Sequence, residues 1–354
     1  MTNPSSDKIM NKKAIFFKKG LCGLSNLGNT CFMNSIIQCL NGCRNFQKFF
    51  LSDSYKNDIN TNKPEHNLVE QWAILSKGLY NKNCVITPSS FFRCVQYLSM
   101  TKGSGEFSGY GENDSQEFLQ FLLENIHIGI TKEVIMTING KPKNDLDKQA
   151  IKAYNSWKQY FRNDFSIIIE KFYGQLISKI TTENDINFLS ESYDPFSNLS
   201  LEIPNKQNIN IYDCLDNFTK KEEIEFKNKE DDNNTYFKNL VFWETPKNLV
   251  IFFKRFDNKG NKKLDLINFP IKNLDLSKYC VGYDRENTIY DLFAVSNHSG
   301  VTEGGHYWAY TKNYDGNWYK YNDKIVTLKN EEDIVTINAY CLFYKKRKSR
   351  INKY

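Results

Sequence analysis

The chain has 354 residues, 40% of them hydrophobic and 25% charged, and these shares are typical of a water-soluble globular protein. No apolar run approaches the ~20 residues that a membrane-spanning helix needs. Residues 1–13 are polar and lack the apolar core of a signal peptide, so the expected location is cytoplasmic or nuclear. The net charge of +6 is modest, and the basic run at 345–350 is interpreted as a solvated tail. Neither a membrane nor a nucleic acid is therefore expected as a partner.

Nine cysteines are scattered along the chain without any C-x-x-C pair. Their odd number and the lack of a secretory signal argue against a disulfide framework. Cys39 and Cys43 are four residues apart, but no histidine is close to them in sequence, so core packing explains them better than a metal. No structural zinc is predicted. The cysteines are Cys22, Cys31, Cys39, Cys43, Cys84, Cys94, Cys214, Cys280 and Cys341.

The most informative stretch of the first half is residues 23–35, GLSNLGNTCFMNS. A polar, glycine-containing loop leads into Cys31, where an apolar helical pattern begins. The unpaired N–H groups at a helix start favour an anion and lower a thiol pKa, so Cys31 is a candidate nucleophile. Asn26 supplies an amide donor a few residues earlier, which suits an oxyanion. A buried structural cysteine is the alternative interpretation.

Further helical patterns fill the first half of the chain. Apolar spacing predicts helices at residues 31–41, 46–51 and 68–80, and another that begins near Phe91. A glycine-rich loop at 103–111 precedes the next predicted helix.

Residues 112–123 predict a helix with an apolar stripe, capped by Asn113 or Asp114. Asp114 and Glu117 lie in its first turn. Taken alone, both carboxylates are explained by compensation of the helix dipole.

The pattern changes from residue 165 onward, and strand patterns dominate from about residue 235. Residues 166–177 fit a helix or strand that leads into a strand, 211–218 fit a short amphipathic helix, and 220–234 fit a solvated, mobile connection. Helices in the first half and an antiparallel sheet in the second predict an α+β fold. The other predicted strands are 196–204, 240–243, 249–256, 290–295, 306–312, 317–321 and 339–344.

A second candidate for chemistry is His306, which follows a flexible Gly304-Gly305 loop and opens a strand. A base held on a strand and oriented by a polar neighbour fits a nucleophile–base–orienter arrangement. A histidine that is merely satisfied in the core or on the surface is the alternative.

The turn after His306 decides which polar side chain reaches it. A five-residue loop at 313–317 makes Asn322 its diagonal neighbour on the same sheet face, at ~7–8 Å between backbones. A two-residue turn on Asp315-Gly316 puts Asp323 on that face instead. Both registers remain open from the sequence.

The Cys31 and His306 segments together resemble the cysteine and histidine boxes of ubiquitin-specific proteases. Residues 113–119, 201–204 and 253–256 resemble further segments of that family, in the same order. The resemblance covers about residues 20–346. It implies a papain-like cysteine protease fold with a thumb at 21–165, fingers at 166–245 and a palm at 246–346, flanked by an extension at 1–20 and a basic tail at 347–354.

The resemblance also assigns roles. It implies Cys31 as nucleophile, His306 as general base, Asn322 as orienter and Asn26 as oxyanion donor. Asp323 is a second candidate orienter or a support. Asp114 and Glu117 match acidic positions that meet the basic tail of ubiquitin. Tyr307 matches an aromatic beside a narrow Gly-Gly channel that includes Gly304 and Gly305, and residues 298–304 match a mobile blocking loop over that tail.

The implied activity is hydrolysis of the bond after the C-terminal glycine of ubiquitin, with ubiquitin and ubiquitinated proteins as partners of a monomer. Many relatives hold a zinc ion in the fingers with two C-x-x-C pairs, but residues 180–190 and 225–237 contain no cysteine, so no cofactor is expected. An inactive ubiquitin-binding module and a protease for a ubiquitin-like modifier are the alternatives.

Overall fold

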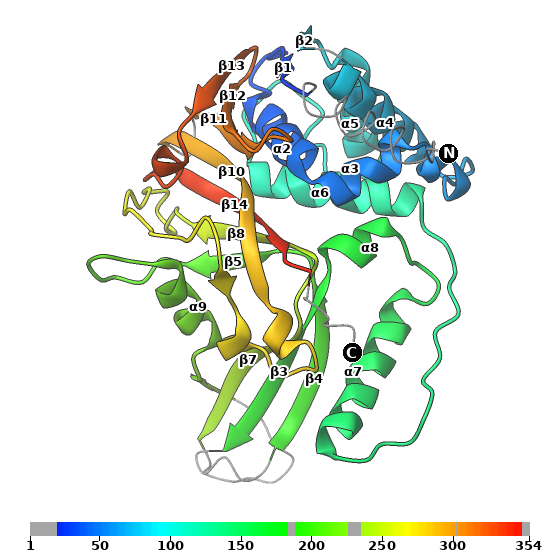
Figure 1. Cartoon of the computed structure of the whole chain (residues 1–354), viewed down its shortest axis with the longest axis vertical. Helices are drawn as coiled ribbons and strands as arrows, with labels where there is room; N and C mark the ends of the chain where they lie inside the picture. The colour runs from blue at the N-terminus through cyan, green and yellow to red at the C-terminus, as the bar shows by residue number, and fades with distance from the viewer. Residues whose placement is uncertain (1–19, 82, 183–187, 226–234, 302–303, 349–354) are drawn as a thin grey trace, which may run out of the picture. The chain divides into compact units, whose positions relative to one another are not determined.

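The computed structural model describes residues 20–81, 83–182, 188–225, 235–301 and 304–348 (Figure 1). The described chain divides into two compact units. Unit 1 comprises residues up to 131 together with 256–264 and 293–343, and unit 2 comprises 132–255, 265–292 and the residues from 344 onward. Within the described part, no helix is both long enough and apolar enough to cross a membrane.

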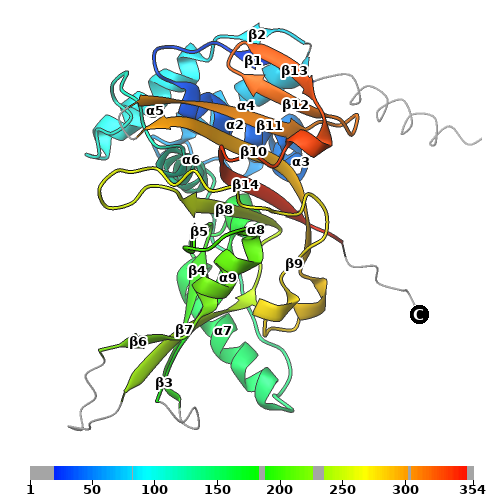
Figure 2. The same cartoon turned by 90° about the vertical axis from the view of Figure 1, so that its left-hand side faces the viewer.

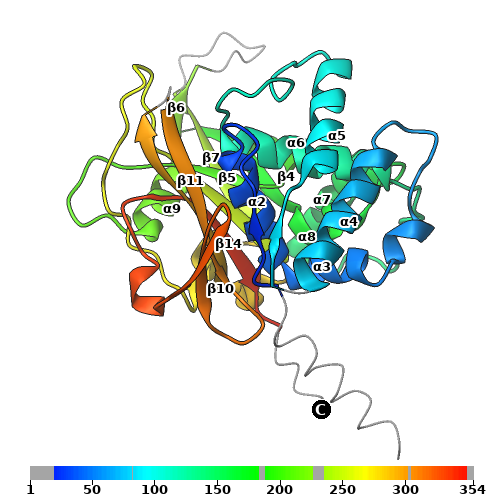
Figure 3. The same cartoon turned by 90° about the horizontal axis from the view of Figure 1, so that it is seen from above.

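The helices of unit 1 surround a central helix, α2, at Cys31–Gly42. Every residue of α2 from Cys31 to Asn41 is buried, because strands cover one side and other helices the opposite side (Figure 3). A Cβ at Gly42 would lie 2.5 Å from a methyl carbon of Thr311, so α2 and its strand are in close contact there. The other helices are α3 (Arg44–Leu51), η1 (Ser54–Asn57), α4 (His66–Asn81), α5 (Ser89–Thr101), α6 (Ser115–Gly129) and η4 (Glu331–Asp333).

The strands of unit 1 form a two-stranded parallel pair and part of a larger sheet (Figure 2). The pair is β1 (Gly23–Leu24) with β2 (Val85–Ile86). In the larger sheet the strand order is β13-β12-β11-β10-β14. Its strands are β10 (Ile289–Val301), β11 (Gly304–Lys312), β12 (Trp318–Asn322), β13 (Ile325–Lys329) and β14 (Ala339–Lys346), and the first residues of β10 and the last of β14 belong to unit 2.

Unit 2 contains a four-stranded sheet of order β4-β3-β7-β6 and the parallel pair β5 and β8. Residues 248–253 of β8 are all buried, as its continuous apolar pattern predicts. The strands are β3 (Gly174–Thr182), β4 (Phe188–Phe196), β5 (Leu199–Glu202), β6 (Glu222–Ile224), β7 (Tyr236–Glu244), β8 (Asn248–Lys254) and β9 (Leu274–Asp275). The helices are α7 (Asp145–Phe161), α8 (Ile167–Phe172), α9 (Ile211–Thr219), η2 (Ser277–Tyr279) and η3 (Arg285–Asn287).

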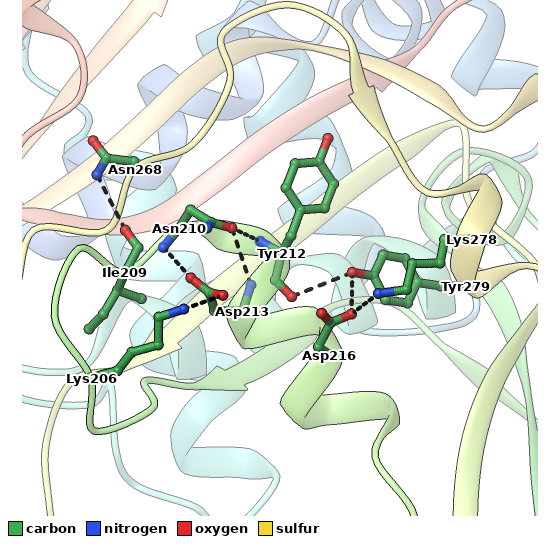
Figure 4. Close-up of polar contacts among 9 residues, drawn as sticks. All are labelled: Lys206, Ile209, Asn210, Tyr212, Asp213, Asp216, Asn268, Lys278 and Tyr279. Carbon is green, nitrogen blue, oxygen red and sulfur yellow. Dashed lines mark hydrogen bonds and ion pairs between the residues drawn. The ribbon is translucent and has the colours of Figure 1, made fainter.

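Helix α9 begins where the sequence predicts because its start is fully capped (Figure 4). The Asn210 side chain accepts from the backbone N–H of Tyr212 and Asp213, and the Asp213 carboxylate accepts from the N–H of Asn210. Three backbone N–H groups at the helix start are thereby satisfied. Farther along the helix, Asp216 accepts from Tyr279 and pairs with Lys278.

The predicted α+β class is confirmed, but several details of the prediction are wrong. Helix α7 and strand β13 lie in segments for which no element is predicted, and the strand prediction at 196–204 misses most of β4. The predicted connection at 220–234 contains β6, while its residues 226–234 lie outside the described part, as do residues 1–19 of the predicted extension. The thumb, fingers and palm boundaries stay predictions.

Candidate active site

Cys31 is the first residue of α2, as predicted, and its side chain is 5% exposed. The prediction of a lowered thiol pKa is wrong for this structure. Burial raises the pKa of Cys31 above its ordinary value, and the negative charges of Asp323 and Glu112 add to that rise. Hydrogen bonds from the backbone N–H groups of Tyr307 and Phe32 act in the opposite direction without outweighing burial. Cys31 therefore needs a base to take its proton.

The register that joins His306 to Asn322 is the one with the five-residue loop. Lys312 pairs with Trp318 and Ala309 with Tyr321, so His306 and Asn322 lie on one face of the sheet. The Nε2 atom of His306 lies 2.5 Å from Oδ1 of Asn322. Since an amide oxygen only accepts, Nε2 carries the proton, and Nδ1 is the ring nitrogen that can take one.

The carboxylate of Asp323 accepts hydrogen bonds from two asparagine side chains. Its Oδ1 accepts from the side-chain amide of Asn34 at 2.8 Å, and its Oδ2 accepts from that of Asn26 at 3.1 Å. Asp323 follows β12 with a φ of 49°, a left-handed backbone conformation. Its carboxylate contacts the loop and helix of Cys31, which fits the support role, and its role as an alternative orienter stays a prediction.

The Asn26 side chain is fixed at both ends. Its Oδ1 accepts from the backbone N–H groups of Gly28 and Thr30, each at 3.0 Å, which holds the loop closed before α2. Its Nδ2 donates to Asp323. One N–H of the amide is thereby used, and the second is the one that can serve an oxyanion.

Asp114 is the N-cap of α6, and its Oδ1 accepts from the Gln116 N–H at 2.6 Å. Its Oδ2 accepts from the hydroxyls of Tyr340 at 2.5 Å and Tyr307 at 3.5 Å. Burial raises the pKa of Asp114. These bonds give the carboxylate a structural task in holding α6 to β11 and β14.

Glu117 is exposed in the first turn of α6. A side-chain hydrogen bond with Glu106, together with partial burial, raises its pKa to about 7. The negative charge of a nearby carboxylate disfavours ionisation of Glu117.

Gly304 and Gly305 lie in strand β11 rather than in a flexible loop. Val301 pairs with Gly304 and Gly300 with Gly305, so the described residues of the predicted loop at 298–304 lie in paired strands, while residues 302–303 lie outside the described part. The mobility of this segment stays a prediction. A Cβ at Gly305 would lie 2.2 Å from the His298 ring. Glycine is needed at 305 because that ring lies beneath the strand.

Tyr307 is buried on the face of β11 opposite His306, where its ring lies 4.4 Å from that of His298. Lys262 donates to both Nδ1 and the backbone oxygen of His298, at 2.9 and 2.7 Å. Burial, then the charges of Lys262 and His306, lower the pKa of His298 to about 4. His298 is therefore neutral near pH 7.

Sequence reasoning missed three residues that support this site: Asn34, Tyr340 and Glu112. Asn34 is a polar residue in an otherwise apolar helix, one turn after Cys31. That unusual position in the sequence could have indicated a role in the site. Glu112 accepts from the Gly305 N–H at 2.8 Å, and nothing in the sequence pattern indicates that contact.

No group of three or more histidine, cysteine, aspartate or glutamate residues that could hold a metal ion occurs among the described residues. The segments 180–190 and 225–237, where the resemblance implies a zinc site in many relatives, overlap the undescribed residues 183–187 and 226–234. The expectation of no zinc stays a prediction.

Known proteins match this chain along nearly its whole length. The family model described as ubiquitin carboxyl-terminal hydrolase matches residues 22–344. Human ubiquitin carboxyl-terminal hydrolase 2 is 34% identical over 97% of this chain and 57% of its own length, and yeast ubiquitin carboxyl-terminal hydrolase 4 is 32% identical over 91% and 39%. The chain thus spans a little over half of the human relative.

Solved structures give the same result. The SAGA Ubp8/Sgf11/Sus1/Sgf73 DUB module bound to ubiquitin aldehyde contains a chain that is 28% identical, with a TM-score of 0.72 over 98% of this chain and 74% of that one. The same module with a substituted Ubp8, bound to monoubiquitin, matches with a TM-score of 0.72 over 94% and 70%.

Proposed function

Because the chain belongs to the ubiquitin carboxyl-terminal hydrolase family, we propose that it is a deubiquitinating cysteine protease. It cleaves the peptide or isopeptide bond after the C-terminal glycine of ubiquitin. The observation that carries the proposal is the hydrogen bond between Nε2 of His306 and Oδ1 of Asn322, together with the position of Cys31 at the start of α2.

The first step joins proton transfer to attack. Nδ1 of His306 takes the Cys31 proton, and the sulfur attacks the carbonyl carbon of the terminal glycine. Asn322 stabilises the imidazolium by accepting from Nε2–H. Because burial raises the Cys31 pKa, the thiol stays protonated until the base takes its proton.

The oxyanion then needs donors. The second N–H of the Asn26 amide and backbone N–H groups at the start of α2 are suited to it, since their positions are fixed before substrate arrives. His306 returns the proton to the leaving lysine amine, and water hydrolyses the thioester with His306 again as base.

Specificity follows from the entrance to the site. A strand start formed by Gly304 and Gly305 suits a tail that ends in two glycines, because side chains would clash in a narrow channel. Exposed Glu117 is suited to a basic tail. Asp114, which caps α6, acts mainly by positioning β11.

The other parts of the proposal are a monomer in the cytoplasm or nucleus that uses no cofactor and has ubiquitin and ubiquitinated proteins as partners. The similar solved structures include a multi-subunit module, so the mass of the purified chain in solution is the direct test of the monomer.

The test of activity is cleavage of a fluorogenic ubiquitin conjugate by the wild type and by Cys31→Ala, with ubiquitin binding measured for both. Turnover by the wild type alone, with binding by both, supports the protease. Binding without turnover by the wild type would contradict it and support an inactive module. Vinyl sulfone probes of ubiquitin and its relatives, used in parallel, identify the modifier.

A further inference from the structure

Two cysteines outside the proposed chemistry lie with their sulfur atoms in contact. The Sγ atoms of Cys22 and Cys84 are 3.4 Å apart. Cys22 is 0% exposed, whereas Cys84 is partly exposed to solvent. A disulfide has an S–S distance of about 2.0 Å, so a small approach of the two side chains is enough to form one.

The backbone favours the same pairing. Strands β1 and β2 are parallel, with Gly23 opposite Val85, so Cys22 and Cys84 immediately precede paired residues. The Gly23 N–H donates to the Cys84 carbonyl at 2.9 Å, and the Leu21 N–H donates to the Asn83 side chain at 3.2 Å. The two cysteines are therefore held side by side at the starts of the paired strands β1 and β2.

The strand pair connects directly to the candidate active site. On its other side, the Leu24 N–H donates to the Asp323 carbonyl at 2.8 Å, and a Cβ at Gly23 would lie 2.3 Å from the Lys324 carbonyl oxygen. Strand β1 is thus held between β2 and the turn after Asn322. The Asp323 carboxylate in turn holds Asn26.

We infer that Cys22 and Cys84 are a reversible redox pair, which forms a disulfide with hydrogen peroxide and thereby fixes the strand that supports Asn26 and Asp323. This inference does not depend on the proposed function. A packed pair of inert thiols is the alternative.

The chemistry balances with one peroxide. The Cys84 thiolate attacks a peroxide oxygen; an S–O bond forms, the O–O bond breaks, and hydroxide leaves. Cys22 then attacks the Cys84 sulfenic acid; the S–S bond forms, the S–O bond breaks, and the departing oxygen takes the Cys22 proton as water. In total, two thiols and one peroxide give one disulfide and two waters.

Burial and the neighbouring Cys84 raise the pKa of Cys22 to about 11, so Cys22 stays a thiol during the first step. The partly exposed Cys84 is the sulfur that meets the oxidant. Cys22 acts as the resolving thiol because its sulfur already lies in contact with the Cys84 sulfur. This proximity compensates for the low thiolate fraction of Cys22.

The test uses the full chain carrying Cys31→Ala, so that peroxide cannot oxidise the candidate nucleophile. After treatment, alkylation and trypsin digestion, we expect peptide 83–93 to be linked to peptide 20–44 through Cys22. We also expect the Tm to rise by about 5 °C and dithiothreitol to reverse the rise, because the bond closes a long loop.

Cys22→Ser and Cys84→Ser should each abolish the link and the Tm rise, whereas Cys94→Ser, which removes another partly exposed cysteine, should retain both. If one serine variant fails to fold, the other supplies the test. Without peroxide, both variants carrying an intact Cys31 should hydrolyse ubiquitin conjugates within about twofold of wild type. A Cys84 oxidised to sulfinic acid without a link, or a link that persists in Cys22→Ser, would overturn the inference.

Discussion

The two faces of the β10–β11 hairpin carry one histidine each, and the two differ in almost every respect. His306 is half-buried and donates from Nε2 to Asn322. His298 is 4% exposed, with Lys262 at its Nδ1 and the rings of Tyr307 and Phe256 around it. The pairing of Ser299 with His306 shows that the rings lie on opposite faces of neighbouring strands.

The contrast shows that the residues in contact with each histidine determine its role. A carbonyl acceptor at Nε2 leaves Nδ1 of His306 able to accept a proton. Burial and a lysine hold His298 neutral, so its ring serves as a flat support beneath Gly305. One face is suited to chemistry and the other to stability.

The largest expected effect on activity comes from comparing His306→Ala with His298→Phe. His306→Ala should lower kcat/KM for a fluorogenic ubiquitin conjugate by about 10³-fold or more, because the general base is lost. His298→Phe keeps a flat ring and should leave kcat/KM within about threefold at pH 7.5. Equal losses in the two variants would show that the faces are not separate in function.

Stability below neutral pH tests the buried face. The folded pKa of His298, about 4, is below its unfolded value of 6.5, so the unfolded state binds more protons between these values. The stability from a neutral His298 is complete above pH 6.5 and falls with pH down to about 4, by roughly 3 kcal/mol. Urea unfolding at pH 7.0 and 4.5 should show this loss, and His298→Phe should lack this part of it.

Asn322 tests the catalytic face more finely. Asn322→Ala should reduce kcat by about 10–100-fold, in the range that loss of a histidine-orienting partner costs elsewhere. Asn322→Asp should restore most of the activity, because a carboxylate also accepts from Nε2. If Asp323→Asn instead produced the larger loss of kcat, the observed register would not describe the active enzyme.

Glu117 gives the smallest expected effect. Its pKa of about 7 means that Glu117 gains negative charge as the pH rises through neutrality. If Glu117 meets a basic tail, KM should fall a few-fold between pH 6 and 8. Glu106→Gln should remove most of this dependence by removing the competing charge, and a KM that does not depend on pH in the wild type would contradict the contact.

The sequence predicts the buried central helix and the alternative hairpin registers, because apolar spacing and turn length are local properties. Helix α7 escapes prediction because only Ala153 and Phe161 are buried among its 17 residues, so its apolar stripe is weak. The contacts of Asp323 escape prediction because its partners, Asn26 and Asn34, are far from it in the sequence. The need for glycine at 305 escapes because it depends on His298, which lies on the other strand.

The close approach of Gly42 to Thr311 has a consequence for the design of inhibitors and variants. A missing methyl group sets how near the helix that begins at Cys31 can lie to the strand that carries His306. Packing at the far end of this helix therefore limits how closely helix and strand can approach. A larger residue at Gly42 should lower the proposed activity even though Cys31 and His306 are both present, and the fluorogenic ubiquitin assay would detect that loss.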